Sequence, residues 1–436
     1  MLKRVLIVSP HFPPLNTPDH QRVRFSLPYY KEFGWQAHVL AVDAEHGDGN
    51  FDPLLEGTIP ADIEVTRLTP YPRRITRRFG VGNLGLRALP RLYRTGLELL
   101  RHADFDLVYF STTVFHAMSL GPLWKKKTGI PYIIDIQDPW RDPRHFQSPR
   151  KEIPGGLIKF SLDYLINGFE EAWVMRHVDH VISVSSHYID DLCKRFPRMT
   201  PSMGTDLPFG ASSLDYEMLD NLEVSQEIFQ PDDGFIHWVY VGRSSMDMAA
   251  ALRTLFCAIR AQRRSSPHRW QKVKLHFIGT SYSPKGCGIK SVEPIAAEYG
   301  LNDMVEEQTN RVSFFQALKL LADSDGILFI SSDDPRYSAS KAYPLILAKR
   351  PLLSVIHQEG PIREILETCK AGHMIPFDPK SDSNRPSTAT LETLNHFLGA
   401  SEKGDLPATD WEAFKPYTAH EMTRRQCKVF DKITKK

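Results

Sequence analysis

The stretch from Asp333 to Val355 holds the residues best suited to binding an anion. It reads as a polar loop, a helix that begins at Ser340 and Lys341, and then Pro351 before a buried strand. The first turn of a helix presents free backbone N–H groups and the positive end of the helix dipole. A hydroxyl and a lysine there favour a phosphate. We therefore predict that Ser340 and Lys341 bind a phosphate, the alternative being an ordinary helix cap with a solvated lysine.

A second candidate for anion binding is Arg243, which follows Gly242 at the end of a predicted strand, 236–241. Open α/β sheets bind their ligands at the carboxyl ends of the strands. We predict that Arg243 contacts a diphosphate, the alternative being a surface arginine on a connecting loop. Gly279 ends another predicted strand and lets the backbone approach a nucleotide, although a tight turn alone also explains a glycine there.

The first half of the chain offers carboxylates instead. Asp135 and Asp138 lie at the end of the predicted strand 132–136, again on the ligand side. A carboxylate there can orient a sugar hydroxyl or stabilise the positive charge of an oxocarbenium-like sugar, so both are candidate catalytic residues. The alternative for Asp138 is a capping role in the turn before Pro139.

Polar residues of two further segments complete the candidates. The loop 13–24 contains side chains that tolerate unusual backbone angles and two arginines that can face a cleft, although helix-surface charge explains the arginines equally well. One histidine follows the predicted strand 107–110, where a buried core histidine is the simpler reading. The predicted acceptor- or phosphate-facing residues are Asn16, Asp19, Arg22, Arg24 and His116.

Short apolar runs that alternate with helical patterns predict parallel βαβ units that position these residues. The first series of predicted strands is 4–8, 37–42, 107–110, 132–136 and 180–184. The second series is 236–241, 274–278, 326–330 and 352–355. The poorly periodic stretch 197–234 between the two series predicts a linker and the entry to a second domain.

The composition agrees with two domains of ordinary size in a soluble globular protein. The chain has 436 residues, 42% of them hydrophobic and 24% charged, with a net charge of +2. The five cysteines are scattered without metal-like spacing, which indicates reduced thiols and a cytoplasmic setting. The apolar run at 5–8 is too short for a signal peptide, and no stretch approaches the ~18 apolar residues of a membrane span. No cluster of His, Cys, Asp or Glu residues in the sequence has the spacing of metal ligands, so we predict no metal site.

Several ordered pieces of the chain together resemble a known family. They are the segments 5–43, 131–143 with its DIQDPW core, 178–192, the HWVYVGR strand 237–243, 311–329 and SKAYPLILAKRPLL at 340–353. In this order they resemble the retaining glycosyltransferases of GT-B architecture, family 4-like (group 1). The resemblance implies two facing Rossmann-like domains with an interdomain cleft, an α/β fold. It implies an acceptor-side domain at 1–210, a nucleotide-sugar-binding domain at 211–408, and a C-terminal helix at 409–436 that returns to the first domain.

The sequence departs from the family at positions that usually contact the donor. Two glutamates are often found where this chain has Arg336 and Pro344, and a phosphate-binding lysine where it has Ala249. A histidine often stands where Gln137 precedes Asp138. These departures favour an alternative without chemistry, a nucleotide-sugar-binding or scaffold protein of the same fold. A sugar-nucleotide epimerase is a second alternative.

The segment from Arg73 to Arg101 contains eight arginines and a single acid, Glu98. Leucines and aromatic residues interleave the arginines, which is typical of surfaces that meet anionic lipid headgroups. Together with the lysines at 125–127, the segment predicts docking on the inner face of the plasma membrane. A solvated helix face is the alternative, and no nucleic-acid-binding module accompanies the arginines.

The sequence therefore predicts a glycosyltransferase that moves a sugar from a nucleotide-diphosphate sugar, with retention. The predicted acceptor is a lipid-linked or cell-surface glycan, as in polysaccharide biosynthesis. The resemblance implies no cofactor and no metal, because positive side chains neutralise the leaving diphosphate.

Overall fold

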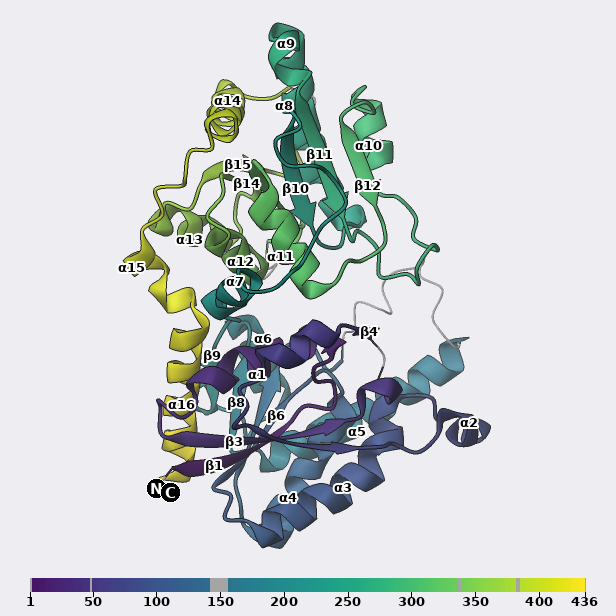
Figure 1. Ribbon diagram of the computed structural model, residues 1–436. Coiled ribbons are helices and arrows are strands. Elements are labelled where there is room, and N and C mark those ends of the chain that lie inside the picture. The colour runs from purple at the N-terminus through teal and green to yellow at the C-terminus, as the bar shows by residue number, and fades with distance from the viewer. Residues whose placement is uncertain (1, 48, 142–155, 336–338, 382–384, 436) are drawn as a thin grey trace. The chain divides into compact units, whose positions relative to one another are not determined.

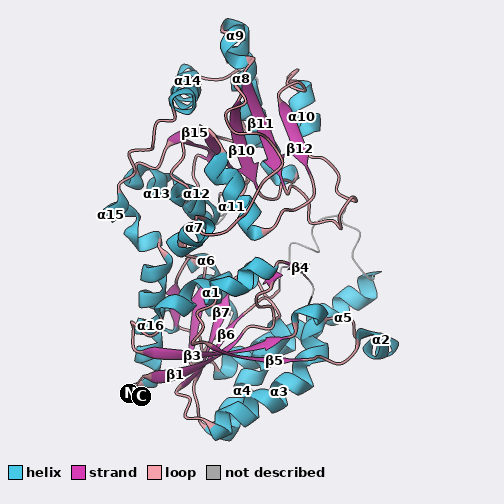
Figure 2. Cartoon of the chain, viewed as in Figure 1, coloured by secondary structure: helices cyan, strands magenta, loops and turns pink. Residues whose placement is uncertain are grey.

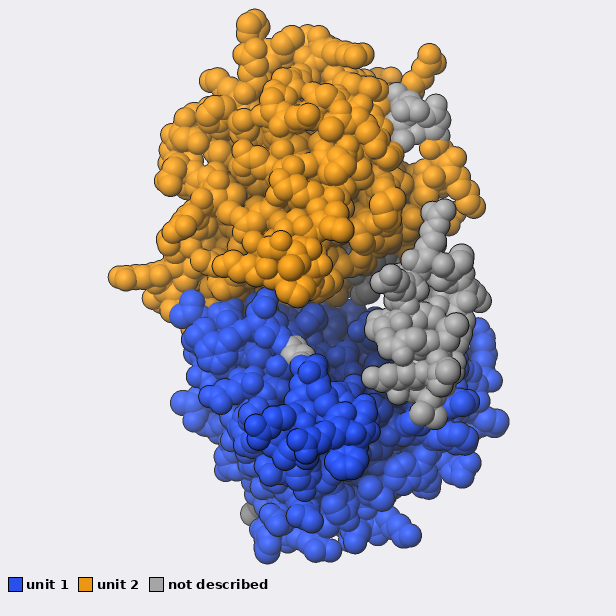
Figure 3. Space-filling model, turned by 90° about the vertical axis from the view of Figure 1, so that its right-hand side faces the viewer, with its two compact units in different colours: residues 1–210, 419–436 blue, residues 211–418 orange. Residues whose placement is uncertain are grey.

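The computed structural model describes residues 2–47, 49–141, 156–335, 339–381 and 385–435. They divide into two compact units, the first formed by 1–210 with 419–436 and the second by 211–418 (Figure 3). Position 336, one of the two at which the family often has a glutamate, lies outside the described residues. No helix within these ranges is long and apolar enough to cross a lipid bilayer.

The first unit is built on a seven-stranded sheet whose strands all run parallel (Figures 1 and 2). The spatial order is β5-β3-β1-β6-β7-β8-β9, so the order of the strands reverses between β1 and β6. Ligands of such sheets bind at the carboxyl ends of the strands beside this switch point. The strands are β1 (Lys3–Val8), β3 (Trp35–Val42), β5 (Glu64–Leu68), β6 (Leu107–Ser111), β7 (Tyr132–Ile136), β8 (His180–Ser183) and β9 (Gly204–Asp206).

Helices cover both faces of this sheet because the central strands are apolar on both sides. Leu6 and Val8 of β1 pack with α3, α4, α5 and α6, whereas Val5 and Ile7 pack with α1 and α16. The helices are α1 (Gln21–Ser26), α2 (Arg73–Thr76), α3 (Leu84–His102), α4 (Leu120–Thr128), α5 (Gly156–His177), α6 (Ser186–Arg195) and α16 (Ala419–Thr434). A short antiparallel pair, β2 (Leu15–Asn16) with β4 (Asn50–Phe51), holds the loop after β1.

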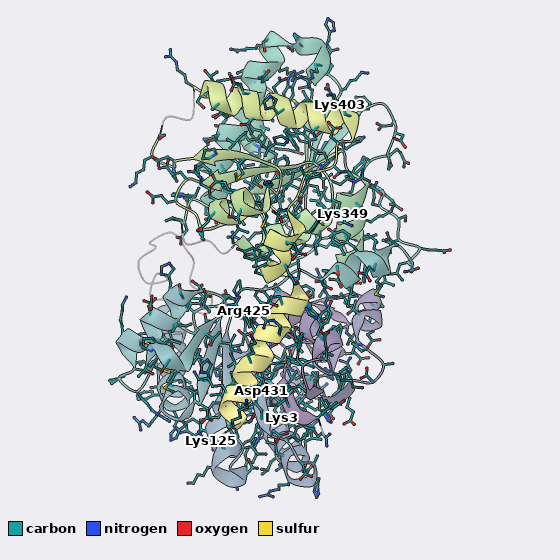
Figure 4. The ribbon with its side chains drawn as sticks, turned by 90° about the vertical axis from the view of Figure 1, so that its left-hand side faces the viewer. Lys3, Lys125, Lys349, Lys403, Arg425 and Asp431 are labelled. Carbon is teal, nitrogen blue, oxygen red and sulfur yellow. The ribbon has the colours of Figure 1, made fainter. Side chains whose placement is uncertain are left out.

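The C-terminal helix α16 is an integral part of the first unit. Phe430 lies fully buried against the rings of Tyr30 and Trp35. Lys3 at the start of β1 and Asp431 of α16 form an ion pair with an Nζ–Oδ1 distance of 2.8 Å (Figure 4). The predicted segment 409–436 is thus divided, because α15 (Trp411–Phe414) groups with the second unit.

The second unit has a six-stranded parallel sheet in the order β12-β11-β10-β13-β14-β15, with its switch point between β10 and β13. Helices α8, α10 and α14 pack on one face against Trp238, and α11, α12 and α13 pack on the other against Val239. The strands are β10 (Ile236–Val241), β11 (Val273–Ile278), β12 (Val305–Gln308), β13 (Gly326–Ile330), β14 (Leu352–His357) and β15 (His373–Phe377). The helices before α15 are α7 (Ser213–Leu219), α8 (Ala249–Ser265), α9 (Pro267–Trp270), α10 (Glu293–Glu298), α11 (Phe314–Asp323), α12 (Ala342–Leu347), α13 (Ile362–Cys369) and α14 (Thr388–Lys403).

The prediction of two parallel α/β series is confirmed. Each of the nine predicted strands corresponds to a strand of the structure, with ends that agree within two residues. The sequence analysis missed β5, β9, β12 and β15, which are the four outermost strands of the two large sheets. It also missed the small pair of β2 with β4.

Candidate functional site

The switch point of the second unit carries Arg243, as predicted from its place after β10. Gly242 precedes it with a backbone φ of +152°, which favours glycine. The Gly242 N–H donates to the carbonyl of Ile278 at 2.9 Å, and the Tyr240 hydroxyl donates to the carbonyl of Arg243 at 2.6 Å. The backbone that presents the guanidinium is therefore held from two sides.

The Arg243 guanidinium is occupied by a neighbouring carboxylate. Its Nη2 and Nη1 atoms donate to the two oxygens of Asp247 at 3.0 and 3.2 Å, and Ser245 bonds to both side chains. Burial on its own raises the pKa of Asp247, but the bonds from Ser245 and Arg243 outweigh it and hold this pKa below its usual value. The Asp247 carbonyl accepts the N–H of Asp333, three residues beyond β13, at 2.7 Å. This backbone bond ties the loop after β10 to the loop after β13, the two strands that flank the switch point.

Ser340 and Lys341 lie in a 3-10 turn, Ala339–Lys341, and the α-helix itself begins one residue later at Ala342. Ser340 is partly buried and Lys341 is exposed, while Ala342 and Tyr343 anchor the turn in the core. Because α12 has only six residues, the attraction for an anion here depends mainly on the Lys341 charge.

Pro344, which replaces a family glutamate, lies inside the first turn of α12. It has no N–H, but the N–H groups of a first turn have no partner within the helix, so the helix tolerates the proline. Its carbonyl accepts the Tyr216 hydroxyl at 2.9 Å. The contact that the structure shows at Pro344 therefore uses its backbone carbonyl and not its side chain.

Gly279 ends β11 with a φ of +74°, a left-handed conformation that favours glycine. The loop that follows is fixed by Glu307, whose buried carboxylate accepts the Thr280 hydroxyl at 2.6 Å and the N–H groups of Val292 and Glu293 at 2.8 and 3.0 Å. The backbone requirement explains the glycine, and a nucleotide contact at Gly279 stays a prediction.

In the first unit, Asp19 forms hydrogen bonds that connect the segments following β1 and β6. Its buried carboxylate accepts the Thr17 hydroxyl at 2.8 Å, the Thr112 hydroxyl at 3.1 Å and the Thr113 N–H at 3.2 Å. His11 Nδ1 lies 3.0 Å from the same carboxylate. Burial on its own raises the pKa of Asp19, but the bond and charge of His11 dominate and hold it well below its usual range. Asp19 is therefore an anion that fixes the loop after β1.

Asp135 and Arg22 were predicted to face the ligand, but both side chains are fully buried. Arg22 Nε donates to Asp135 Oδ2 at 2.7 Å, and its Nη2 donates to the carbonyl of Leu207 at 2.7 Å. Ser111 and Gln137 also donate to Asp135 Oδ2, each at 2.9 Å. This placement favours a structural role for the pair over the predicted catalytic and acceptor contacts. Gln137, where the family often has a histidine, belongs to the same network.

Asp138, two residues beyond β7, is exposed at the carboxyl edge of the sheet. Trp140 stacks on Phe115 with ring centroids 5.3 Å apart. The next residue of that turn, His116, pairs with Glu170 of α5 at an Nδ1–Oε2 distance of 2.7 Å. Of the two predicted catalytic carboxylates, Asp138 is the one that solvent reaches, because Asp135 is fully buried.

Two predicted residues take structural positions in the loop after β1. Arg24 is buried and its Nε donates to the Gln21 side chain at 2.8 Å. Asn16 is partly buried and pairs with Asn50 between β2 and β4. The adjacent His20 is fully buried, and burial lowers the pKa of its imidazole to about 4. The loop is thus packed against the unit by several side chains.

The sequence analysis missed two partners of the predicted residues. His11 lies three residues beyond the end of β1, and its position near a strand end was a usable signal. Asp247 stands four residues after Arg243, but the spacing alone does not reveal a pair because the intervening residues are not a regular α-helix. No group of three or more His, Cys, Asp or Glu side chains in the described ranges is arranged to hold a metal ion.

Comparison with known proteins identifies the first unit. Residues 22–200, which lie in the first unit, match the glycosyl transferase 4-like domain. No curated protein matches this chain.

Solved structures show the same fold across the whole chain. A glycosyltransferase from Rickettsia africae is 11% identical, with a TM-score of 0.59 and coverage of 100% of this chain and 99% of its own. Anabaena HepE, solved with UDP and glucose, is 14% identical, with a TM-score of 0.57 and coverage of 99% and 100%. A UDP-forming trehalose-phosphate synthase from Burkholderia xenovorans is 11% identical, with a TM-score of 0.56 and coverage of 99% of each chain. The chain therefore has the GT-B fold of two Rossmann-like domains.

Proposed function

We propose that this glycosyltransferase moves a sugar from a nucleotide-diphosphate sugar, bound at the carboxyl edge of the second unit's sheet, to an acceptor bound at the first unit. The observation that carries the proposal is the guanidinium of Arg243 at the β10/β13 switch point, where sheets of this order bind nucleotides. The similar Anabaena protein was solved with UDP and glucose, and the similar Burkholderia synthase is UDP-forming, which supports a nucleotide-sugar donor.

Arg243 and Lys341 supply the positive charge that transfer requires. Negative charge grows on the leaving diphosphate as the bond to the sugar breaks, and fixed cations stabilise that charge without having to reorganise. An arginine fork binds phosphate oxygens in pairs, whereas a lysine acts as a mobile point charge. In this proposal positive side chains take the role that a metal ion plays in other transferases.

On the first unit, Asp138 positions the acceptor or the sugar. It is exposed at the carboxyl edge, whereas Asp135 is committed to Arg22. Retention of the anomeric configuration is part of the proposal and comes from the family resemblance. An exposed carboxylate fits that chemistry because it can stabilise an oxocarbenium-like sugar.

The experiment that tests the proposal measures release of nucleoside diphosphate from UDP-, GDP-, ADP-, CDP- and dTDP-sugars without an acceptor. The proposal predicts slow turnover of one donor to free sugar, lost in Arg243→Ala and kept in Arg363→Ala. Arg363 is a matched control because it also pairs with an acid four residues away, Glu367, on the exposed face of α13. An epimerised donor would identify an epimerase, and no turnover of any donor would favour a scaffold protein.

We further propose that the acceptor is a lipid-linked or cell-surface glycan and that the protein docks on the anionic inner face of the plasma membrane. The surface proposed for docking is the turn 71–79, formed by α2 and the 3-10 turn Arg77–Phe79 at the periphery of the first unit (Figure 1). Phe79 is 80% exposed and Ile75 is 50% exposed. The exposed arginines of the turn are Arg73, Arg74, Arg77 and Arg78.

The arginines of α3 do not all belong to this docking surface. Arg87 is buried and donates to the carbonyls of Tyr71 and His46, both at 3.2 Å. Arg91 donates to the Thr69 carbonyl at 2.6 Å. These two arginines attach the start of the turn 71–79 to the rest of the first unit.

The residue types of the turn 71–79 suit an anionic bilayer surface. Its exposed apolar side chains can insert among the lipids, and the neighbouring guanidinium groups can bind lipid phosphates.

A further inference from the structure

The loop between β10 and α8 holds an arginine and a carboxylate in a geometry that a phosphate can replace. Two Arg243 nitrogens face two Asp247 oxygens at 3.0 and 3.2 Å, a fork against a fork. Phosphate oxygens take the same bidentate arrangement on a guanidinium. Both side chains are about 30% exposed, so a ligand from solvent can reach the pair.

The surroundings of the pair are suited to binding an anion. Helix α8 begins two residues after Asp247, is 17 residues long, and has no side-chain cap at its N-terminal residue, Met248. The start of α8 and the Arg243 fork lie at the same switch point, which is where a nucleotide phosphate binds in sheets of this order. Without a ligand, the anion that is bonded to Arg243 is the Asp247 carboxylate.

The backbone of Asp247 is held by a contact that remains when the carboxylate leaves the arginine. The Asp247 carbonyl accepts the N–H of Asp333, three residues beyond β13. The side chain can therefore rotate away from Arg243 and Ser245 while its backbone stays anchored to the loop after β13. Such an arrangement permits an exchange of partners without refolding of the loop.

Building on the proposed function, we propose that Asp247 occupies the arginine fork in place of the donor diphosphate, so that donor binding exchanges a carboxylate for a phosphate. Asp247 then weakens binding of every anionic ligand at Arg243, because it competes for the fork and repels a second negative charge. After transfer, its return to Arg243 favours release of the nucleoside diphosphate. Asp247 is thus a positioning residue that sets donor affinity and product release.

Asp247→Asn tests this exchange because asparagine keeps the shape and one acceptor oxygen but removes the charge. We expect calorimetry to show that the variant binds the preferred nucleoside diphosphate about tenfold more tightly. Product inhibition by that nucleoside diphosphate should strengthen by a similar factor, which a merely structural role would not produce. Glu367→Gln, which removes the acid of the pair Arg363–Glu367, should change neither quantity.

The outcomes separate this inference from the function on which it rests. If wild-type protein binds a nucleoside diphosphate and Asp247→Asn binds it equally or more weakly, the exchange is wrong and Asp247 orients Arg243 for the donor. If wild-type protein shows no binding and Asp247→Asn acquires it, the exchange is supported. If neither protein binds UDP, GDP, ADP, CDP or dTDP, both the exchange and the proposed function are overturned.

Discussion

Arg22 Nε lies 2.7 Å from Asp135 Oδ2, and neither side chain is exposed to solvent. The pair joins α1 to the end of β7 beside the β1/β6 switch point. Charges buried to this extent are stable only when they are paired and hydrogen-bonded, and here carbonyls and neighbouring side chains complete the bonding. The pair therefore ties α1 to the sheet of the first unit.

Removing one member of this pair should strongly destabilise the protein. Arg22→Ala leaves a buried carboxylate without its cation, and we expect it to lower the free energy of unfolding of the first unit by about 3–5 kcal/mol. Urea unfolding followed by circular dichroism measures this. The control is Lys3→Ala, which breaks the partly exposed pair Lys3–Asp431 and should cost about 1 kcal/mol or less. Equal effects of the two variants would show that the buried pair has no special role.

Asp138→Asn should reduce turnover without affecting the fold. The residue is exposed, so its charge contributes little to stability, whereas a carboxylate at the reacting sugar or acceptor lowers the barrier. We expect kcat to fall about 10²-fold or more while the melting temperature stays unchanged. Asp190→Asn, at a carboxylate on the surface of α6, is the control. A variant with full kcat would remove Asp138 from the mechanism.

Stability should fall between pH 6.5 and about 4, in a window set by two buried histidines. Burial lowers the pKa of His20 to about 4, and burial together with the charge of His237 lowers that of His276 to about 4, from 6.5. In this pH window the two histidines are protonated in the unfolded chain but neutral in the folded chain. The free energy of unfolding therefore decreases as the pH falls. His276→Gln should flatten the pH dependence of the melting temperature. An unchanged slope in that variant would contradict the assignment. The Asp19 carboxylate acts only at lower pH, because its folded pKa is also depressed.

Binding to anionic membranes should depend on the turn 71–79. We expect wild-type protein to sediment with phosphatidylserine-rich vesicles at low salt and to dissociate as salt is raised. Phe79→Ser should weaken binding through lost insertion, and Arg77→Glu with Arg78→Glu should abolish it. The matched control reverses two exposed lysines of the second unit, Lys380→Glu with Lys403→Glu. Equal loss in the control, or no binding by wild-type protein, would refute docking through this turn.

Treatment with EDTA should leave donor turnover unchanged, because the proposal assigns the diphosphate charge to Arg243 and Lys341. The measurement compares rates before and after chelation and after readdition of Mg²⁺ or Mn²⁺. A rate that collapses with EDTA and recovers with either ion would show that a metal takes part.

The central strands could be predicted from the sequence and the edge strands could not. Strands such as β10 and β13 are buried on both faces and read as continuous apolar runs. The outer strand β12 alternates buried and exposed residues with two glutamates, and β9 has only three residues, none of them buried. Edge strands carry such patterns because one of their two edges has no neighbouring strand and meets solvent. Hydrophobic periodicity alone therefore predicts the central strands of each sheet and misses its edge strands.

The sequence predicted which site residues follow the ends of strands. It did not predict which side chains these residues pair with. The position of Arg243 after an apolar run was enough to place it at the carboxyl end of a strand, and the strand order of the structure puts that strand at the switch point. Its bond to Asp247 depends on an irregular loop, and the burial of Arg22 with Asp135 joins residues 113 positions apart. Sequence patterns carry no record of such distant pairs, so the same reasoning assigned both the buried Asp135 and the exposed Asp138 to the ligand.

The most direct test of the central claim is thermal unfolding of wild-type protein and Arg243→Ala in the presence of UDP, GDP, ADP, CDP or dTDP. A ligand that binds only the folded state raises the melting temperature in proportion to the logarithm of its concentration above the dissociation constant. The account predicts a selective rise with one nucleoside diphosphate in wild-type protein, and its loss in Arg243→Ala but not in Arg363→Ala. An equal rise in wild-type protein and Arg243→Ala, or no rise with any of the five, would contradict it.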